Sequence, residues 1–443
     1  MPTLVLTAIY LFTMPHSITW AHWGADGGDL ATAIACRRLP HPPGFPTYLL
    51  LGATFMRLPL GDPAWRLNLL SALSAAGAAG LTAAAVHRIS FSVIAPVTAS
   101  LSLGLAPLFW SQALITEVYG PAAFFSAVLL FQAINQTPAW ISGAVWGIGI
   151  GVHPTLLFLA PLVVRRDREP FIRTALYSTI PALVVAGFLY GPVLLAWGRR
   201  PSPWADFSNL SGWWTYVSGQ LYHGYIFGLP GVLWPRRFLA WAGLVARQFT
   251  PVGALMALWG LRYLWRYHRC LALATALAFG ALSLYSIGYN TADSLVYLVP
   301  ALPLVALWLG AGLDYLLCKC RRRIPYSPLT FCLLLLPALQ GVLFWNQMDI
   351  SRDCSAITWA LDTLYAAPSD AILLTAQDGA TFALWYVRDA LRKRPDVWIV
   401  DWDLMSHAPY RRLLSAELGI DLSGNPEEIL KNLKRPVIAV QAP

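Results

Sequence analysis

The feature that most constrains this chain is a series of long apolar runs, separated by short connectors that carry small clusters of basic residues. Only 12% of the 443 residues are charged and 57% are hydrophobic, whereas a soluble domain has roughly 25% charged residues. Apolar runs of roughly 20 residues cross a bilayer as helices. The sequence therefore predicts an α-helical polytopic protein of the lipid bilayer, with about eleven transmembrane helices, some shorter than a full crossing.

The distribution of basic residues indicates an orientation rather than a nucleic-acid partner. The net charge is +9, but the basic residues lie in small clusters between apolar runs. Arg165–Arg168 and Lys319–Arg323 are the clearest candidates for the cytoplasmic side. This assignment puts the connector 21–68 and the C-terminal region on the extracytoplasmic side of the cell membrane. Two basic pairs, Arg199-Arg200 and Arg236-Arg237, instead border a large outer loop.

The apolar stretch Trp140–Val164 is long enough for one crossing, but Gly147, Gly149, Gly151 and His153-Pro154 interrupt it in the middle. A single crossing would put Arg165–Arg168 outside, against the positive-inside rule. We therefore expect two short helices that turn back at His153-Pro154. Because lipid cannot satisfy freed backbone groups, a break at membrane depth implies a cavity lined by protein or water.

The chain changes character after about Asn346, where strand and helix patterns alternate. We expect residues 1–346 to form a transmembrane domain, and residues 347–443 a small α/β domain on the outer face. The second domain has no glycine-rich phosphate-binding motif. Its expected elements are the strands Ala371–Thr375, Val397–Val400 and Val437–Val440 and the helix Thr381–Leu391.

The first outer connector, residues 21–68, concentrates polar groups in Asp26-Gly-Gly-Asp29 and His41-Pro-Pro-Gly-Phe-Pro46. Carboxylates at i and i+3 share one side of a helical turn, and such a pair beside a membrane suits a general base with a helper. The alternative is that both acids only cap or solvate the start of a helix.

Three further connectors on the expected outer side carry ionisable groups, Glu117, His153 and Asp293. Each has a structural alternative, because Glu117 could cap a helix, His153-Pro154 could be a kink and Asp293 could solvate a turn. Acids and a histidine from four connectors on one face nevertheless favour an active site.

Several short motifs together resemble a known family. They follow the order seen in a group of multi-spanning proteins whose bacterial members have no assigned function and whose animal members are protein O-mannosyltransferases. The resemblance covers nearly the whole chain, and the group is similar to the C-type glycosyltransferases (GT-C fold). The motifs are Asp26-Gly-Gly-Asp29, His41-Pro-Pro-Gly-Phe-Pro46, Arg66-Leu-Asn68-Leu-Leu-Ser71, Glu117-Val-Tyr119, Gly151-Val-His153-Pro154, Asp293…Tyr297…Pro300 and Asp378…Leu384-Trp-Tyr386…Arg394-Pro-Asp-Val397.

The resemblance implies a glycosyltransferase that moves a sugar such as mannose from a polyprenyl-phosphate donor to a protein or glycan acceptor, with inversion. Asp26 would act as general base, with Asp29 and Glu117 as further catalytic residues. The family pattern usually has Glu at the position of Asp29, so the resemblance supports Asp26 more firmly. His41 and Arg66 would stabilise the departing phosphate. The other expected substrate-binding residues are Tyr48, Asn68, Tyr119, His153, Asp293 and Tyr297.

Other functions remain open from the sequence. Two acids in one loop could hold a divalent cation, although no full ligand set is visible. A lipid-linked sugar flippase or another transporter is the main alternative, but such proteins usually carry ionisable residues inside their spans and have related halves. A non-catalytic membrane scaffold would leave the acidic outer connectors unexplained.

Overall fold

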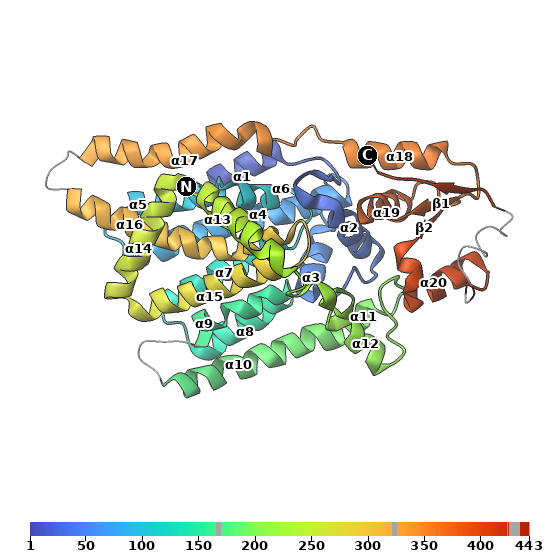
Figure 1. Ribbon diagram of the computed structural model, residues 1–443, viewed down its shortest axis with the longest axis horizontal. Coiled ribbons are helices and arrows are strands. Elements are labelled where there is room, and N and C mark those ends of the chain that lie inside the picture. Colours follow the sequence, from blue (N-terminus) through green and yellow to red (C-terminus); the bar gives the residue numbers. More distant parts are fainter. Residues whose placement is uncertain (165–169, 321–325, 423, 425–434, 443) are drawn as a thin grey trace.

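In the computed structural model, a long bundle of helices is joined at one end to a small α/β unit (Figure 1). Apolar helices dominate because almost every long apolar run lacks internal charges. The structure describes residues 1–164, 170–320, 326–422, 424 and 435–442.

The first half of the bundle begins with a short helix and the connector that contains Asp26. Labels with η denote short 3₁₀ or π segments. The elements are α1 (Pro2–Thr13), η1 (Ala21–Asp26), α2 (Gly27–Cys36), α3 (Pro46–Phe55), α4 (Pro63–Ile89), α5 (Ile94–Gly104), α6 (Pro107–Leu114), α7 (Tyr119–Ile134), α8 (Ala139–Ile150), η2 (Pro154–Leu159) and α9 (Ala160–Val164).

The second half contains the long loop between α11 and α13 and the helices that close the bundle. The elements are α10 (Phe171–Phe188), η3 (Leu189–Val193), α11 (Leu194–Trp197), α12 (Leu210–Val217), η4 (Gln220–Tyr225), η5 (Gly231–Leu233), α13 (Trp234–Gln248), α14 (Thr250–Tyr267), α15 (Arg269–Gly288), η6 (Ser294–Ala301), α16 (Leu302–Cys320) and α17 (Tyr326–Met348).

Among the described residues, four helical segments are long and apolar enough to cross a membrane, or up to six if each of two bent pairs is one span. Five shorter apolar helices accompany them. The expectation of about eleven crossings also counted short apolar runs, and it stays a prediction. The basic clusters used for orientation, 165–168 and 321–323, lie outside the described residues. The four long segments are Pro63–Ile89, Phe171–Trp197, Arg269–Gly288 and Ser294–Lys319.

Small residues let neighbouring helices approach closely, as is common where helices pack in membranes. A Cβ added at Gly260 in α14 would lie 1.7 Å from the carbonyl oxygen of Trp308 in α16. A Cβ added at Gly120 in α7 would lie 2.9 Å from the carbonyl oxygen of Ser71 in α4. The second contact holds α7, which begins at Tyr119 beside the site described below.

The expected break in Trp140–Val164 is confirmed. Helix α8 ends at Ile150, and η2 and α9 then fold back against it. The indole N–H of Trp146 donates to the carbonyl oxygen of Leu156 at 2.7 Å, across the turn. His153 therefore lies at the tip of a helical hairpin rather than inside a continuous helix.

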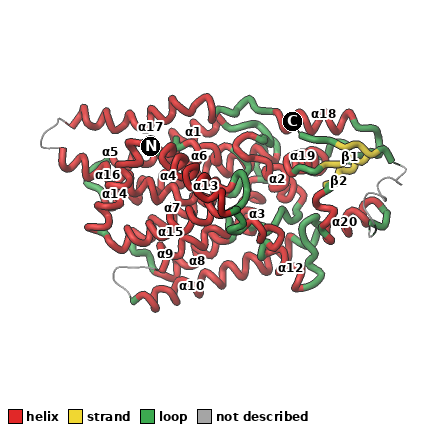
Figure 2. The backbone as a smooth tube through the Cα atoms, in the orientation of Figure 1, coloured by secondary structure: helices red, strands yellow, loops and turns green. Residues whose placement is uncertain are grey.

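The C-terminal unit contains a parallel sheet with the strand order β2-β1-β3, seen as arrows in Figure 1 and in yellow in Figure 2. Ile372 of β1 pairs with Trp398 of β2 and with Val437 of β3. The small α/β unit expected from the sequence is therefore confirmed. The elements are α18 (Ser355–Ala366), β1 (Ile372–Thr375), α19 (Asp378–Trp385), η7 (Tyr386–Ala390), β2 (Trp398–Asp401), η8 (Asp403–Ser406), α20 (Ala408–Leu418) and β3 (Val437–Ala439).

Helix α19 fastens this unit to the first connector, so the C-terminal region and the Asp26 loop lie on the same side of the bundle. The indole N–H of Trp20 donates to the carbonyl oxygen of Gly379 at 3.0 Å, and Arg38 pairs with Asp389. The approach of α2 to α19 is close because residue 28 is glycine. An added Cβ at Gly28 would lie 2.5 Å from the carbonyl oxygen of Phe382.

We expect Gly28→Ala to destabilise the protein by about 1–3 kcal/mol, because the new methyl group must displace backbone of α19. Thermal unfolding in detergent measures the effect. Gly280→Ala is the matched control, since an added Cβ there meets nothing within 4 Å and alanine favours a helix. Equal melting temperatures for the two variants would contradict the close contact.

Candidate active site

Six segments of the chain meet around one cavity of about 350 Å³ at the junction of the bundle and the α/β unit. They are the first connector, the start of α7, the tip of the α8–η2 hairpin, the loop before α13, the α15–η6 junction and the start of α19. The lining residues are Asp26, Leu30, His41, Pro42, Pro43, Phe45, Glu117, Val118, Tyr119, His153, Pro154, Ser218, Gly219, Tyr222, Tyr225, Ile226, Tyr285, Tyr289, Thr291, Asp293, Tyr297 and Asp378.

Asp26 projects into this cavity rather than capping its helix. It occupies the N-cap position of α2 but makes no side-chain capping hydrogen bond, which argues against the simple capping alternative. Its side chain is 43% exposed, and Oδ2 lies 3.8 Å from Nε2 of His41. The pKa of Asp26 is raised because the surrounding protein shields it from bulk water, an effect that the charge of His41 partly offsets.

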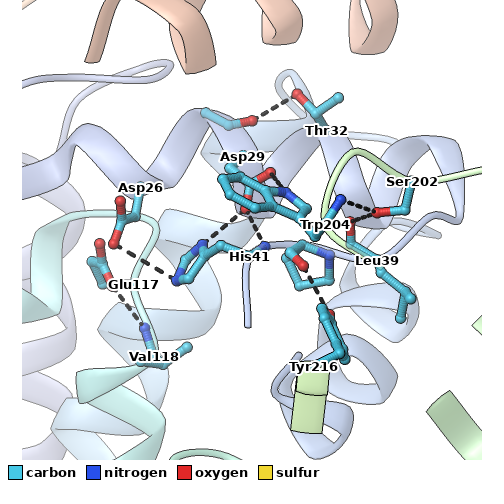
Figure 3. Close-up of polar contacts among 12 residues, drawn as sticks. Asp26, Asp29, Thr32, Leu39, His41, Glu117, Val118, Ser202, Trp204 and Tyr216 are labelled. Carbon is cyan, nitrogen blue, oxygen red and sulfur yellow. Dashed lines mark hydrogen bonds and ion pairs between the residues drawn. The ribbon is translucent and has the colours of Figure 1, made fainter. Parts of the chain in front are cut away.

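Asp29 is buried behind the cavity and holds His41 in place (Figure 3). Its Oδ2 accepts hydrogen bonds from the backbone N–H of His41 at 2.7 Å and from Nδ1 of the same residue at 2.8 Å. Its Oδ1 accepts from the indole N–H of Trp204 at 3.1 Å. Because a carboxylate only accepts, Nδ1 of His41 carries the proton and Nε2 is left to face Asp26.

His41 is a cation at neutral pH. Burial alone would lower the pKa of its imidazole, but the carboxyl groups of Asp26 and Asp29 are the main causes that raise that pKa to about 9. No arginine or lysine lines the cavity in the part of the chain that the structure describes. The imidazolium is therefore the fixed positive charge of the site.

Glu117 lies beside Asp26 on the same side of His41 (Figure 3). Its carboxyl group is buried and accepts a 3.2 Å hydrogen bond from the backbone N–H of Val118. Burial, followed by repulsion from Asp26, raises the pKa of Glu117 well above its ordinary value. Two acids this close do not both ionise easily, so a protonated Glu117 leaves the negative charge on Asp26.

His153 is fixed as a neutral hydrogen-bond donor. The backbone N–H of Thr155 donates to its Nδ1 at 3.3 Å, and the hydroxyl of the same threonine lies 2.7 Å from that nitrogen. Burial, together with the charge of His41, lowers the pKa of His153 to about 3. Since Nδ1 accepts, the single proton of the neutral ring is on Nε2.

A closed series of aromatic rings surrounds the cavity. Phe45 stacks on His153 with an interplanar angle of 12°, and the remaining rings meet edge to face or tilted. Flat apolar faces of this kind suit the apolar faces of a sugar ring. With neighbouring centroids 5.1–6.5 Å apart, the series runs through His41, Tyr222, Tyr225, Tyr289, Tyr297, His153, Phe45 and back to His41.

The structure does not bring three of the expected substrate-binding residues to the cavity. The guanidinium of Arg66 donates to the carbonyl oxygens of Leu60, Met56 and Gly61, and so closes the turn before α4. Three of its five N–H donors are thereby used and Arg66 does not line the cavity, so its expected role at a phosphate stays a prediction.

The other two are buried nearby. The amide of Asn68 donates to the carbonyl oxygens of Pro15 and Ser17 and accepts from the hydroxyl of Thr116 at 2.7 Å. Tyr48 is fully buried within α3 and does not line the cavity. Both residues are buried in the protein next to the segments that line the cavity.

The sequence reasoning did not select Asp378 or several tyrosines that line the cavity. In the loop between α11 and α13, Tyr222 and Tyr225 lie three positions apart on one side of η4, a spacing that could have indicated them. Tyr285 and Tyr289, at i and i+4 near the end of α15, give a similar signal. Asp378 follows β1 closely, where side chains commonly reach a site.

The described residues contain no group of three or more His, Cys, Asp or Glu side chains arranged to hold a metal ion. Asp29 and His41 are engaged with each other. The divalent cation considered from the sequence stays a prediction, and no step below uses one.

Comparison with known proteins confirms the family resemblance. Residues 26–165 match the family described as the protein O-mannosyl-transferase TMEM260 N-terminal domain. The protein O-mannosyl-transferase TMEM260 of Mus musculus is 24% identical to this chain over 96% of the chain. The chain spans 65% of the length of that mouse relative.

Solved structures share the fold. ArnT from Cupriavidus metallidurans bound to undecaprenyl phosphate has a TM-score of 0.58 at 15% identity, covering 90% of this chain and 88% of its own. The Archaeoglobus fulgidus oligosaccharyltransferase AglB, in complex with an inhibitory peptide and a dolichol-phosphate, has a TM-score of 0.51 at 12% identity, covering 88% and 63%. The expected GT-C fold is thereby confirmed.

Proposed function

We propose that this chain is an integral-membrane glycosyltransferase that moves a sugar from a polyprenyl-phosphate donor to an acceptor hydroxyl, with inversion at the anomeric carbon. The observation that carries the proposal is the meeting of acids from four separate segments with a protonated His41, in one aromatic cavity. The bound undecaprenyl and dolichol phosphates of the structural neighbours support the donor class. The name of the mouse relative supports mannose as the sugar and a protein as the acceptor.

In the proposed reaction, Asp26 takes the proton of the acceptor hydroxyl. The oxygen attacks the anomeric carbon from the face opposite the phosphate, and the bond between that carbon and the phosphate oxygen breaks. The electron pair of this bond leaves with the polyprenyl phosphate. A raised pKa makes Asp26 a stronger base than an ordinary aspartate, and Glu117 keeps the neighbouring position neutral.

The departing phosphate gains negative charge and needs positive groups or donors. The imidazolium of His41 supplies the charge, and the Nε2–H of His153 supplies a neutral donor on the other side of Phe45. In this proposal the two histidines take the role at the phosphate that was expected of Arg66, whose guanidinium is hydrogen-bonded to the turn before α4. Asp29 would be a positioning residue that keeps His41 charged and oriented.

We expect a bell-shaped dependence of the transfer rate on pH. The rate rises as Asp26 loses its proton and falls when His41 loses its own near pH 9. Asp29→Asn removes a charge that raises the pKa of His41, so the basic limb should move to lower pH. Initial rates of both proteins between pH 5 and 10 test this expectation. A basic limb that does not move would contradict its assignment to His41.

His153 gives a second test through its tautomer. In a Gln side chain the amide nitrogen lies near the position of Nε2, whereas in Asn it lies near Nδ1. His153→Gln should therefore retain most of the transfer rate, and His153→Asn should lose about 10-fold or more, the cost of one donor to a charged group. Single-turnover rates with saturating donor measure the difference. Equal rates for the two variants would contradict a donor role for Nε2–H.

We propose the extracytoplasmic side for the cavity, because the basic clusters of the sequence favour the cytoplasm for the opposite connectors. The donor sugar would then enter from the outer leaflet.

The test of the proposed function uses the purified full chain with a panel of polyprenyl-phosphate sugars and threonine-containing peptides or oligosaccharides. Mass spectrometry identifies the glycosylated acceptor, and proton NMR gives the anomeric configuration of the new bond. The proposal predicts transfer with inversion from at least one donor. Retention of configuration would contradict direct displacement assisted by a single base.

A further inference from the structure

The α/β unit contributes one residue to the lining of the cavity in the part of the chain that the structure describes, and this residue is Asp378. It is the first residue of α19, immediately after the carboxyl end of β1 and its short connection. The α/β unit thus forms part of the cavity wall.

The backbone places Asp378 next to Asp26. The neighbouring residue Gly379 accepts a hydrogen bond from Trp20, and a Cβ built on Gly379 would lie 3.9 Å from the Cβ of Ala25. Ala25 and Gly379 directly adjoin Asp26 and Asp378 in sequence. The two carboxyl groups therefore rise from adjoining backbone at the same wall.

The carboxyl group of Asp378 has no structural task that would explain it. It is exposed to the cavity and makes no hydrogen bond or ion pair with the described residues. An acid in the first turn of a helix is favourable through the helix dipole, but this effect is worth only about 0.3–1 kcal/mol at an exposed site. Limited access to bulk water, followed by the charges of Asp26 and Asp401, raises its pKa to about 6, so it is mainly ionised at neutral pH.

We propose that Asp378 binds the polypeptide acceptor, by accepting a hydrogen bond from a backbone N–H beside the serine or threonine whose hydroxyl Asp26 deprotonates. This inference rests on the proposed function and adds the acceptor subsite to it. A carboxylate with free acceptor positions suits an N–H donor, and hydrogen bonds to charged groups are among the strong ones.

The position of Asp378 favours the acceptor over the donor. A lipid-linked sugar reaches the cavity from the membrane helices, which provide Tyr119, His153 and Tyr297. Asp378 belongs to the unit at the far end of the bundle, beyond α2 (Figure 1). A polypeptide acceptor in the aqueous phase would approach the cavity from this end, away from the side by which the lipid-linked donor enters.

The test separates acceptor binding from donor use with the purified full chain. Asp378→Asn should raise the KM for a threonine-containing peptide about 10-fold, because the neutral amide oxygen accepts a weaker hydrogen bond than the carboxylate does, while the KM for the polyprenyl-phosphate sugar stays unchanged. Asp378→Glu keeps the charge and should recover part of the acceptor affinity. Asp362→Asn, on an exposed face of α18, is the control and should match wild type in melting temperature and kinetics.

Equilibrium binding of a fluorescent threonine-containing peptide gives a readout that does not depend on transfer, and Asp378→Asn should weaken it by the same factor. If the wild type transfers sugar and Asp378→Asn has an unchanged peptide affinity and peptide KM, the role of Asp378 is overturned and the proposed function stands. A higher KM for the donor, or for an oligosaccharide acceptor alone, would also overturn it. A wild type that binds the peptide but transfers no sugar would contradict the proposed function instead.

Discussion

Asp26→Asn is expected to lower the rate of sugar transfer about 10²- to 10⁴-fold, the usual cost of removing a positioned general base. The substitution keeps the shape of the side chain and removes the proton acceptor. Folding should change little, because Asp26 makes no capping hydrogen bond and its nearest partner, His41, lies 3.8 Å away. Single-turnover transfer with saturating donor measures the chemical step directly.

The control for this variant is a carboxylate far from the cavity. Asp362→Asn should transfer sugar at the wild-type rate, and both variants should unfold at the wild-type temperature. The variant at Asp26 should still bind the polyprenyl-phosphate donor, because the base acts on the acceptor. A rate within a few-fold of wild type would assign the proton transfer to another group.

His41→Gln should have the second-largest effect, a loss of about 10²- to 10³-fold in the transfer rate, as found when one preorganised electrostatic group is removed. The glutamine keeps a polar side chain but removes the fixed positive charge. That charge also holds down the pKa of Asp26, so the acidic limb of the pH profile should move to higher pH in the variant. A full pH profile of the transfer rate records both changes.

His87→Gln, at the far end of α4 from the cavity, is the matched control for the removal of a histidine. It should leave the transfer rate and both limbs of the profile unchanged. A wild-type rate in His41→Gln would mean that the departing phosphate does not need the imidazolium. A loss of rate without any shift of the acidic limb would contradict the electrostatic contact between His41 and Asp26.

Much of the fold follows from local patterns in the sequence. The apolar runs predict helices, and the glycines and His153-Pro154 predict the break between α8 and η2. Short β-branched and apolar runs predict all three strands, with boundaries one residue from those observed for β1 and β2. The number of crossings is harder to predict, because several apolar helices are too short to span a bilayer alone.

The candidate site was partly predictable, because connectors on the same side of a bundle can meet at its end. Asp26, Glu117, His153 and Asp293 were selected for this reason, and they line one cavity. Their catalytic roles stay predictions. The motifs of the family resemblance added His41, whose charge is favoured mainly by Asp26 and Asp29.

The remaining site residues depend on tertiary contacts that no local pattern records. Arg66 has the right chemistry for a phosphate, but its guanidinium is used by carbonyl groups within ten residues of it. Asp378 lies at the cavity because α19 packs on α2, and glycine at position 28 allows the close contact between these helices. Trp204 donates a hydrogen bond to Asp29, which lies 175 positions away in the chain. Such pairings become visible only in the folded structure.

The central claim is that this cavity breaks the bond between a sugar and a polyprenyl phosphate. Its most direct test is a single-turnover reaction of the purified protein in detergent, where no membrane separates two compartments, with a radiolabelled polyprenyl-phosphate sugar and an acceptor peptide. The account predicts that label appears on the peptide and that free polyprenyl phosphate appears in equal amount, with both signals lost in Asp26→Asn. Recovery of the intact lipid-linked sugar for every donor, together with its movement across the bilayer of proteoliposomes, would identify a transporter and contradict the account.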